Sequence, residues 1–319
     1  MPSRLKKSSF YDKIKKKSRR EALKDGIIVI NKEENITSQG AVNRVKRLFG
    51  VKKAGHTGTL DPMATGVLPV LIGRAVKASE YMIGSDKHYI ATLLLGITTD
   101  TEDVTGAILN ECDRVPTEAE VLAAADSFIG SYMQTPPMYS ALKVGGKKLC
   151  DLARSGVEIE REPREIFIRS LGVKRLSERE YSLDVVCSGG TYIRTLCADI
   201  GKKLGTGGVM KTLCRAEASV FLLEDAHTLT EIEAMSEAER EALILPTERV
   251  FLKYREVRLP AFFEKLCRSG LEIYLAKIGF AAECGERVRL LGEGGFFALG
   301  EVREYESGLA IKPIKQFEV

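Results

Sequence analysis

The residue types best suited to chemistry occur in a loop rich in glycine and threonine, residues 55–66. Asp61 stands directly before Pro62, and a residue before proline is held extended rather than helical. The glycines let a ligand or another backbone approach closely. The loop can therefore present the Asp61 carboxylate into a cleft. The alternative, an Asx-turn that only orders the loop, is the commoner role of an isolated Asp-Pro pair.

A second cluster, residues 189–195, joins a glycine turn to the start of a predicted amphipathic helix. Arg194 lies near the positive end of that helix dipole, which is unfavourable for a cation unless an anion is close. Asp61 or a phosphate could be that anion. Pairing in a partly closed pocket would keep Asp61 ionised where burial disfavours charge. The alternative is a surface cation on a solvated helix.

Tyr89 lies in an expected strand that begins at Lys87, and the acidic residues Asp100, Glu102 and Asp103 follow it. Taken alone, such a tyrosine more often belongs to a core, and such an acidic run is more often a solvated turn. Paired carboxylates would permit glycosidase or metal chemistry, but the sequence does not fix their separation. We give that chemistry little weight.

The elements that must position these residues follow from apolar periodicity, capping signals and turn residues. Strands and helices recur without a strict βαβ rhythm, which favours an α+β fold with a mixed, largely antiparallel central sheet and flanking helices. The predicted elements are a strand at 26–30, a helix from Thr37, a loop packed on the core over 51–73, a strand at 87–97, a helix after a capping box at Thr117 and Glu120, strands at 165–173 and 181–187, a helix through 193–204, and a linking helix after a capping box at Ser236 and Glu239.

The chain divides into a main domain, residues 25–250, and a small β-rich domain, residues 251–319. Short segments punctuated by glycine predict the strands of the second domain. Within the main domain, residues from about 130 to 164 hold a Pro-Pro pair, a Gly-Gly pair and a basic cluster that includes Lys143. This segment is predicted to protrude as an insertion with a short helix near 147–154.

Charge is distributed unevenly along the 319 residues. Lys and Arg number 48 against 44 Asp and Glu, and the formal net charge of +4 is too small to hold a polyanion by bulk charge. Residues 1–24 contain ten Lys or Arg but only Asp12 and Glu21. This basic tail is expected to be disordered or weakly helical, and to serve either solubility or attraction of phosphates.

Composition argues against several classes of protein. Seven scattered cysteines without a C-x-x-C pair, and three histidines, favour neither a zinc site nor a disulfide framework. No apolar run approaches the roughly 20 residues of a membrane span, and the basic N-terminus lacks the apolar segment of a signal peptide. The sequence therefore predicts a cytoplasmic protein without a membrane or metal role.

Four motifs, taken in order, resemble the bacterial stand-alone tRNA pseudouridine synthases of the TruB type. They are residues 55–66, 87–103, 134–143 and 190–194, and the similarity runs from about Gly26 to the C-terminal domain. The resemblance implies an enzyme that isomerises uridine in the tRNA T-loop, at position 55, without cofactor or metal. It also implies the pseudouridine synthase fold, an RNA-gripping thumb at 130–164 and a PUA-like RNA-binding domain at the C-terminus.

The same resemblance assigns roles to single residues. Asp61 corresponds to the catalytic carboxylate, and it attacks the ribose C1′ or the uracil ring, or assists a glycal route. Arg194 corresponds to its arginine partner, and Tyr89 to the tyrosine that stacks on the target base. The remaining substrate-binding positions are His56, which holds the T-loop, Tyr192, Leu213 and, in the thumb, Lys143. Near Leu213 the pattern departs from the family, because Val209 and Cys214 stand where histidine and arginine are usual.

These roles fit simple physical requirements. A base must leave its stack before its glycosidic bond can be attacked, and an aromatic side chain such as Tyr89 can receive it. An aspartate with an ordinary pKa needs no neighbouring base to become ionised at neutral pH. A local basic stripe can bind the RNA phosphates even though the whole chain is near neutral. Its expected members are Arg44, Arg47, Lys52, Lys53, Lys143, Lys147 and Lys148.

Two other interpretations remain open from the sequence. One is an RNA-binding or chaperone protein that folds the T-arm of tRNA without chemistry. The other is an RNA-guided relative that works with accessory proteins, although the long insertion favours an enzyme that needs no obligatory protein partner and acts as a monomer. The set Asp61, Tyr89 and Arg194 favours an enzyme, because binding a polyanion does not require a carboxylate.

Overall fold

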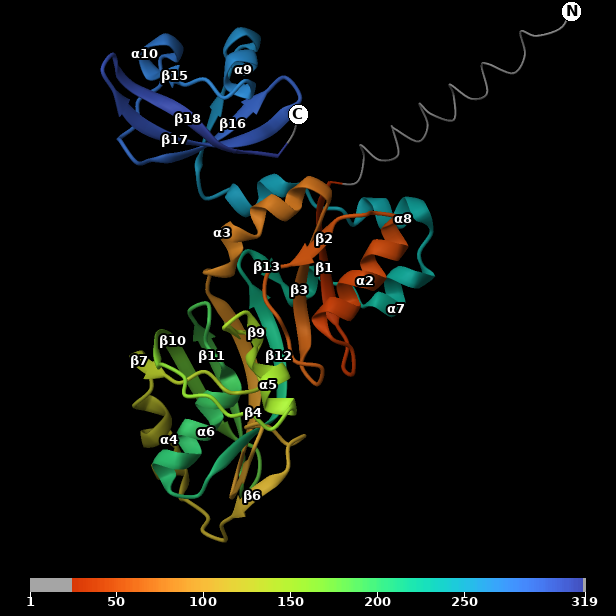
Figure 1. The fold of residues 1–319 in the computed structure, drawn as a ribbon, viewed down its shortest axis with the longest axis vertical. Coiled ribbons are helices and arrows are strands. Elements are labelled where there is room, and N and C mark those ends of the chain that lie inside the picture. The colour runs from red at the N-terminus through yellow and green to blue at the C-terminus, as the bar shows by residue number, and fades with distance from the viewer. Residues whose placement is uncertain (1–24, 318–319) are drawn as a thin grey trace, which may run out of the picture.

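The structure, a computed structural model, describes residues 25–317, and the predicted basic tail, residues 1–24, lies outside them. Within the described residues, a nine-stranded sheet and a five-stranded sheet form the frames of two regions (Figure 1). Two short hairpins accompany them: β5 (Ile97–Thr99) with β6 (Ile108–Glu111), and β8 (Lys143–Val144) with β9 (Lys147–Lys148).

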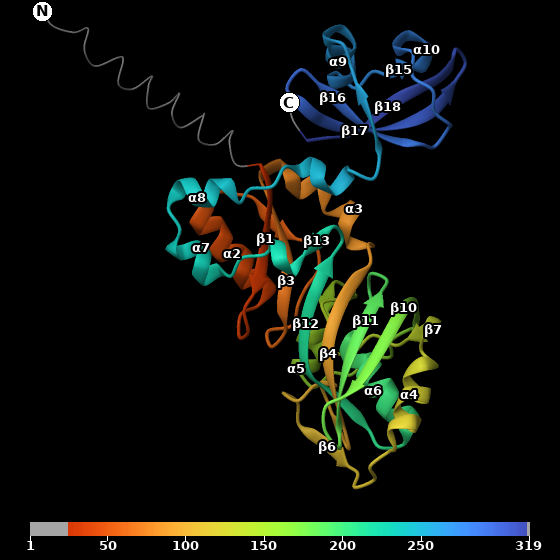
Figure 2. The ribbon, with the colours of Figure 1, turned by 180° about the vertical axis from the view of Figure 1, so that it is seen from behind.

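The large sheet is mixed. Its neighbouring strands are antiparallel except β3 and β12, which run parallel and join the two halves of the sheet (Figure 2). The predicted α+β class with a largely antiparallel sheet is therefore confirmed. In spatial order the strands are β1 (Gly26–Lys32), β3 (Thr65–Ile72), β12 (Gly208–Ala218), β4 (Lys87–Leu95), β11 (Glu180–Cys187), β10 (Arg164–Arg175) and β7 (Gly130–Gln134), with β2 (Ala54–His56) on β3 and β13 (Phe221–Leu222) on β12.

Helices pack against this sheet in two groups (Figure 1). The first, beside β1 and β3, consists of α2 (Ser38–Phe49), α7 (Leu229–Ala234) and α8 (Glu237–Ala242). The second, against the other half, consists of α4 (Glu118–Asp126) and α6 (Ile193–Leu204). The predicted start of α2 and the predicted capping boxes of α4 and α8 are confirmed, since Thr37, Thr117 and Ser236 are the N-cap residues. These caps fix where each helix begins.

The prediction of a loop throughout 51–73 is wrong for its last third, which forms the central strand β3. Alternate residues of β1 and β3 enter different cores: Ile28 and Leu68 pack in one cluster, Ile27 and Val67 in another. Because successive side chains of a strand point to opposite faces, this part of the sheet is covered on both sides. Such a strand shows a continuous apolar run instead of an alternating pattern, and Pro69 obscured it further.

The predicted insertion also begins later than expected. Residues 130–134 form the edge strand β7, which pairs with β10, so they belong to the sheet. The protruding part contains the β8–β9 hairpin and α5 (Leu149–Arg154), which confirms the predicted short helix. The prediction failed at β7 because Met133 and Ser131 on its outer face are exposed, so the strand lacks a strong apolar pattern.

A separate mixed sheet forms from residue 255 onward. The predicted strands 287–291, 296–302 and 309–314 are confirmed. Its spatial order is β14 (Arg255–Arg258), β16 (Arg287–Gly292), β17 (Gly295–Tyr305), β18 (Gly308–Gln316) and β15 (Ile273–Tyr274). Two helices that were not predicted accompany it, α9 (Ala261–Arg268) and α10 (Leu275–Ile278). None of the helices within residues 25–317 is long and apolar enough to cross a bilayer.

Phe251 lies at the centre of the contact between the two regions. Its ring packs against Tyr81 on one side and against Phe296 and Phe317 on the other. Tyr81 belongs to α3 (Glu80–Ile83), which follows the 3₁₀ helix η1 (Gly73–Ala78), while Phe251 ends η3 (Thr247–Phe251). A third 3₁₀ helix, η2 (Leu223–Asp225), lies between β13 and α7. The shared aromatic core joins the small sheet firmly to the large one.

Candidate active site

In the loop between β2 and β3, hydrogen bonds to main-chain groups fix the backbone around Asp61. The Ser38 hydroxyl, in the first turn of α2, accepts from the Leu60 N–H at 2.8 Å and donates to the Leu60 carbonyl at 3.0 Å. On the other side, the Ala64 N–H donates to the Asp61 carbonyl at 3.1 Å. The backbone is therefore fixed on both sides of Asp61, while its side chain remains 33% exposed.

Lys32, at the end of β1, also holds this loop through hydrogen bonds. Its ammonium donates to the carbonyls of Glu33 and Ile36 at 2.9 Å and to that of Pro62 at 3.1 Å. Burial lowers the pKa of Lys32 to about 8, and the nearby Asp61 charge opposes that shift. The buried ammonium thus ties the end of β1 to the residue that follows Asp61.

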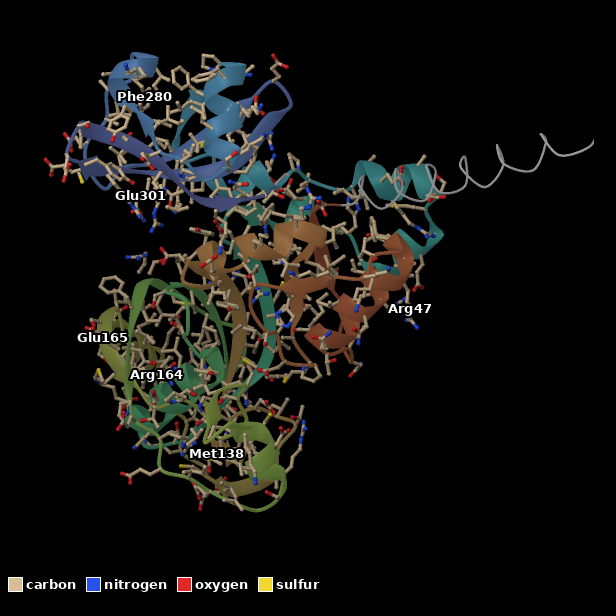
Figure 3. The ribbon with its side chains drawn as sticks, turned by 45° about the horizontal axis from the view of Figure 1, so that its top comes forward. Arg47, Met138, Arg164, Glu165, Phe280 and Glu301 are labelled. Atoms are coloured by element: carbon tan, nitrogen blue, oxygen red, sulfur yellow. The ribbon has the colours of Figure 1, made fainter. Side chains whose placement is uncertain are left out.

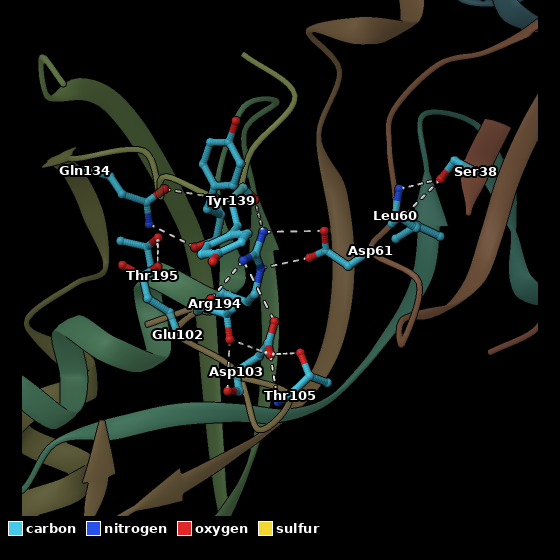
Figure 4. A network of polar contacts seen from close by, with 12 residues as sticks. Ser38, Leu60, Asp61, Glu102, Asp103, Thr105, Gln134, Tyr139, Arg194 and Thr195 are labelled. Atoms are coloured by element: carbon cyan, nitrogen blue, oxygen red, sulfur yellow. Dashed lines mark hydrogen bonds and ion pairs between the residues drawn. The ribbon is translucent and has the colours of Figure 1, made fainter. Parts of the chain in front are cut away.

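Arg194 meets Asp61 through a two-point contact (Figure 4). Its Nε lies 2.9 Å from Asp61 Oδ2, and its Nη2 lies 3.4 Å from Asp61 Oδ1. The guanidinium is only 5% exposed, whereas the carboxylate is one-third exposed. The predicted pairing of Arg194 with Asp61 is present. The arginine is buried, while part of the Asp61 carboxylate remains accessible to solvent.

Three further groups fix Arg194 itself. Nη1 donates to the Thr101 carbonyl at 2.9 Å, and Nη2 donates to the Tyr139 carbonyl at 2.7 Å. Asp103 Oδ2 lies 3.8 Å from Nη1. The planar fork of an arginine can satisfy several acceptors at fixed angles, which a lysine ammonium cannot do. Three groups besides Asp61, namely two main-chain carbonyls and the Asp103 carboxylate, therefore hold Arg194 in place.

The acidic run after β5 is only in part the solvated turn that the sequence suggested, because Asp100 is exposed but Asp103 is buried. Asp103 is 5% exposed, and its Oδ1 accepts from the Thr101 hydroxyl at 2.8 Å and from the Thr105 N–H at 2.9 Å. Glu102 accepts from the Thr195 hydroxyl at 2.5 Å, and burial raises its pKa. The hydroxyl residues interleaved with the acids were the sequence signal for this buried network, because they satisfy carboxylates away from water.

Tyr89 lies on β4 with only 9% of its surface exposed. Burial raises its pKa, Arg215 opposes the rise, and Asp61 adds to it, so the phenol lies within the influence of the candidate carboxylate. Leu213 lies on the adjacent strand β12, opposite Ala91, and is also buried. The structure thus brings Tyr89 and Leu213 to neighbouring strands beside the Asp61 loop.

Tyr192 is the N-cap residue of α6, two positions before Arg194, and is half-buried. Burial raises the pKa of its phenol. Lys143 lies on β8 in the insertion, paired in register with Lys148. Tyr192 therefore joins the Arg194 region directly, whereas the backbone of Lys143 belongs to a hairpin outside the large sheet.

His56 ends β2, and its Nδ1 is buried without a hydrogen-bond partner among the residues that the structure describes. Burial lowers its pKa, and the Arg215 charge lowers it further. The folded protein therefore keeps His56 neutral at a pH at which an unfolded chain would protonate it.

This depressed pKa predicts an acid sensitivity. The stability associated with a neutral His56 is fully present above the unfolded pKa and is lost progressively as the pH falls from that value through the lower folded pKa, because the unfolded state binds more protons in that range. We expect the wild type to lose unfolding free energy relative to His56→Gln between about pH 7.5 and about pH 5.5. Urea unfolding of both proteins measures it, and parallel pH profiles would contradict it.

Arg44 and Arg47, two members of the expected basic stripe, lie on α2. Arg44 forms an ion pair with Glu233 of α7, at 2.6 Å, so its charge is locally balanced. Arg47 and Lys53 are exposed (Figure 3 labels Arg47).

The two positions at which the sequence departs from the family pattern lie on β12, where Val209 is fully buried and Cys214 is half-buried. Within residues 25–317, no three His, Cys, Asp or Glu side chains group as potential metal ligands.

The fold is similar to that of two solved Cbf5 complexes. The likeness to "Crystal Structure of a Cbf5-Nop10-Gar1 Complex" has a TM-score of 0.69 at 24% sequence identity and covers 93% of this chain and 86% of that chain. "Crystal structure of the archaeal box H/ACA sRNP Nop10-Cbf5 complex" gives 0.67 at 22%, covering 93% and 87%. These two likenesses show that the chain shares the fold of Cbf5.

Family models give the narrower assignment. "TruB family pseudouridylate synthase (N terminal domain)" matches residues 46–193, and "tRNA pseudouridylate synthase B C-terminal domain" matches residues 194–252. The "tRNA pseudouridine synthase B" of Thiobacillus denitrificans is 42% identical over 87% of this chain and 92% of its own length. That of Alkaliphilus oremlandii is 44% identical over 78% and 83%. The chain belongs to the TruB family.

Proposed function

We propose that this chain converts uridine to pseudouridine in tRNA, at position 55 of the T-loop, and that Asp61 is its catalytic group. Family membership supports the activity. The observation that carries the assignment of Asp61 is its contact with the buried guanidinium of Arg194, which leaves one-third of the carboxylate side chain open. A carboxylate that a buried cation holds in place, and that is still partly open, can contact a substrate.

The reaction breaks the N-glycosidic bond of uridine and forms a carbon–carbon bond between the same sugar and the same base. Substrate and product are isomers, so the step needs no redox partner. Asp61 acts as an ionised carboxylate toward the ribose C1′, toward the uracil ring, or in a glycal route. Arg194 keeps the carboxylate oriented through each of these alternatives, because its Nε and Nη2 contact different oxygens.

The target base must leave the T-loop stack to reach Asp61, which costs a few kcal/mol. Tyr89 supplies an aromatic face for the extruded base, and Leu213 on the neighbouring strand and Tyr192 at the start of α6 supply further contacts. His56, at the end of β2 and with a pKa lowered by burial, is assigned to hold the reorganised loop. The set of five residues thus combines a reactive group with surfaces that receive one displaced nucleotide.

RNA contacts outside this centre come from two regions. The insertion at 130–164 acts as an RNA-gripping thumb with Lys143 among its cations, and residues 251–319 act as a PUA-like RNA-binding domain. The aromatic contacts of Phe251 hold that domain against the large sheet. The protein acts as a monomer without an obligatory protein partner, in the cytoplasm where tRNA is matured.

One experiment tests the proposal directly. The chain is incubated with an unmodified tRNA transcript, and pseudouridine is mapped by chemical labelling. A transcript that carries cytidine at position 55 is the matched control. We expect one new pseudouridine at position 55 in the first RNA and none in the second. Tight binding without any pseudouridine would instead support the RNA-binding or chaperone interpretation.

The basic tail gives a prediction about affinity. Removing residues 1–24 removes ten cations and two acids, and exposed cations bind RNA by releasing counterions, at about 0.7–0.9 of a log unit per phosphate contact in the salt slope. We expect the truncated chain to bind tRNA more weakly at low salt, with the difference fading as salt rises. Filter binding over a salt series measures it. An equal loss at every salt concentration would mean that the tail acts structurally.

A further inference from the structure

Gln134 is a buried amide at a junction between the sheet and the insertion. It is the last residue of β7 and is 2% exposed. Its Oε1 accepts from the Tyr192 N–H at 2.8 Å, and its Nε2 donates to the Tyr192 carbonyl at 3.0 Å and to the Tyr132 hydroxyl at 2.6 Å. The side chain therefore clamps both polar groups of one residue's main chain, as a neighbouring strand would.

The clamped residue determines where α6 begins. Tyr192 is the N-cap of α6 and has no side-chain cap of its own, although its carbonyl accepts the first helical hydrogen bond, from Leu196 at 3.0 Å. The first turn of a helix has backbone groups without helical partners, so its position depends on external contacts. Arg194 is the second residue of this helix. The direction in which its side chain leaves the backbone therefore depends on how Gln134 holds Tyr192.

A second path also runs from Gln134 to Arg194. The chain leaves β7 at Gln134, passes through the buried Pro136 and Pro137, and reaches Tyr139, whose carbonyl accepts from Arg194 Nη2 at 2.7 Å. Prolines restrict the backbone and keep this short segment stiff. Figure 4 shows Gln134 and Tyr139 on one side of Arg194 and Asp61 on the other. Both paths converge on the guanidinium that contacts Asp61.

We propose that Gln134 is a positioning residue for the isomerisation: it fixes the start of α6 and the root of the insertion together, so that Arg194 is aimed at Asp61. This inference rests on the proposed function. It gives the insertion a second task besides contact with RNA, because its first residues form part of the support of the candidate carboxylate. Gln134 itself touches no reacting atom.

The test compares three single variants with the wild type under single-turnover conditions on the same tRNA transcript. Gln134→Met has a similar volume but neither donates nor accepts. Gln134→Glu can still accept from the Tyr192 N–H but has lost the amide donors. Tyr132→Phe is the matched control: it removes the third partner of Gln134 and leaves the clamp on Tyr192, while its ring still packs against Phe128.

We expect Gln134→Met to lower the rate constant of pseudouridine formation by about ten- to a hundredfold, since small misplacements near a reacting group have effects of that size. Gln134→Glu should lose less, and Tyr132→Phe should remain close to the wild type. Affinity for tRNA and KM should change little in all three. A merely structural role would instead lower thermal stability and affinity together and leave the rate constant of the folded fraction unchanged.

A double-mutant cycle with Arg194→Lys tests whether the effect passes through the arginine. If Gln134 acts by aiming Arg194, adding Gln134→Met to Arg194→Lys causes little further loss. Multiplied losses would overturn the inference, and so would full activity of Gln134→Met. If Gln134→Met does not fold, the same cycle with Gln134→Glu decides. An inactive wild type would refute the proposed function itself, which distinguishes that failure from failure of the Gln134 inference alone.

Discussion

Asp61→Asn will lower the rate of pseudouridine formation by more than about 10⁴-fold, the scale on which removal of an essential reacting group acts. The amide has almost the same shape as the carboxylate, but it has no negative charge and offers only one acceptor oxygen. All three alternatives, attack on the ribose C1′, attack on the uracil ring and the glycal route, require the negatively charged carboxylate of Asp61. The measurement is the single-turnover rate on an unmodified tRNA transcript.

Binding of tRNA by Asp61→Asn should be retained or slightly improved, because a negative charge is removed from a site that receives a polyanion. The fold should also persist, since the loop is held by the Ser38 hydroxyl and the Lys32 ammonium through main-chain groups. Asn at 61 can still accept from Arg194 through one oxygen. Turnover equal to that of the wild type would exclude Asp61 as the catalytic group.

The candidate site was predictable where its signals are local. Asp61 could be found from the Asp-Pro pair in a glycine-rich loop, and Arg194 from its unfavourable place at a helix start. Their roles came from resemblance, because nothing in either segment specifies the partner. The contact between them links positions 133 residues apart, and only the assembled sheet brings α6 to the Asp61 loop.

The supporting residues were not predictable for the same reason. Gln134 holds a residue 58 positions away, and Ser38 holds one 22 positions away. A glutamine or a serine in a single sequence gives no sign that it will be buried with its polar atoms satisfied by a distant backbone. Asp103 is a partial exception: the threonines beside it are a local signal of burial, but acids are usually exposed, and its cationic partner Arg194 lies 91 positions further along the chain.

Strand β12 is an element of the central sheet that the sequence did not predict. It carries Lys211, Thr212, Arg215 and Glu217, and such a polar composition does not predict a strand at the centre of a sheet. Arg215 is nonetheless 1% exposed, because its Nε donates to the Val67 carbonyl at 2.7 Å. Close packing also requires Gly66, where a side chain would come within 2.3 Å of the Arg215 carbonyl oxygen. These constraints are long-range and appear only in the structure.

Replacing Arg194 should have two separable effects, and two variants separate them. Arg194→Met leaves the buried Asp103 carboxylate without its cation and the Thr101 and Tyr139 carbonyls without their donor. Removing one partner of a buried pair costs about 3–5 kcal/mol of unfolding free energy. We expect urea unfolding to show a loss of that order, together with a near-complete loss of activity.

Arg194→Lys isolates the geometric part of the argument. The ammonium keeps the positive charge beside Asp61 and Asp103, so stability should fall much less than in Arg194→Met. It cannot contact both oxygens of Asp61 while also bonding the Thr101 and Tyr139 carbonyls, because its donors leave from a single atom. We expect the single-turnover rate to fall by about a hundredfold with tRNA affinity nearly unchanged. If Arg194→Lys reacts as fast as the wild type, charge alone suffices, and the fork that orients Asp61 has no part in catalysis.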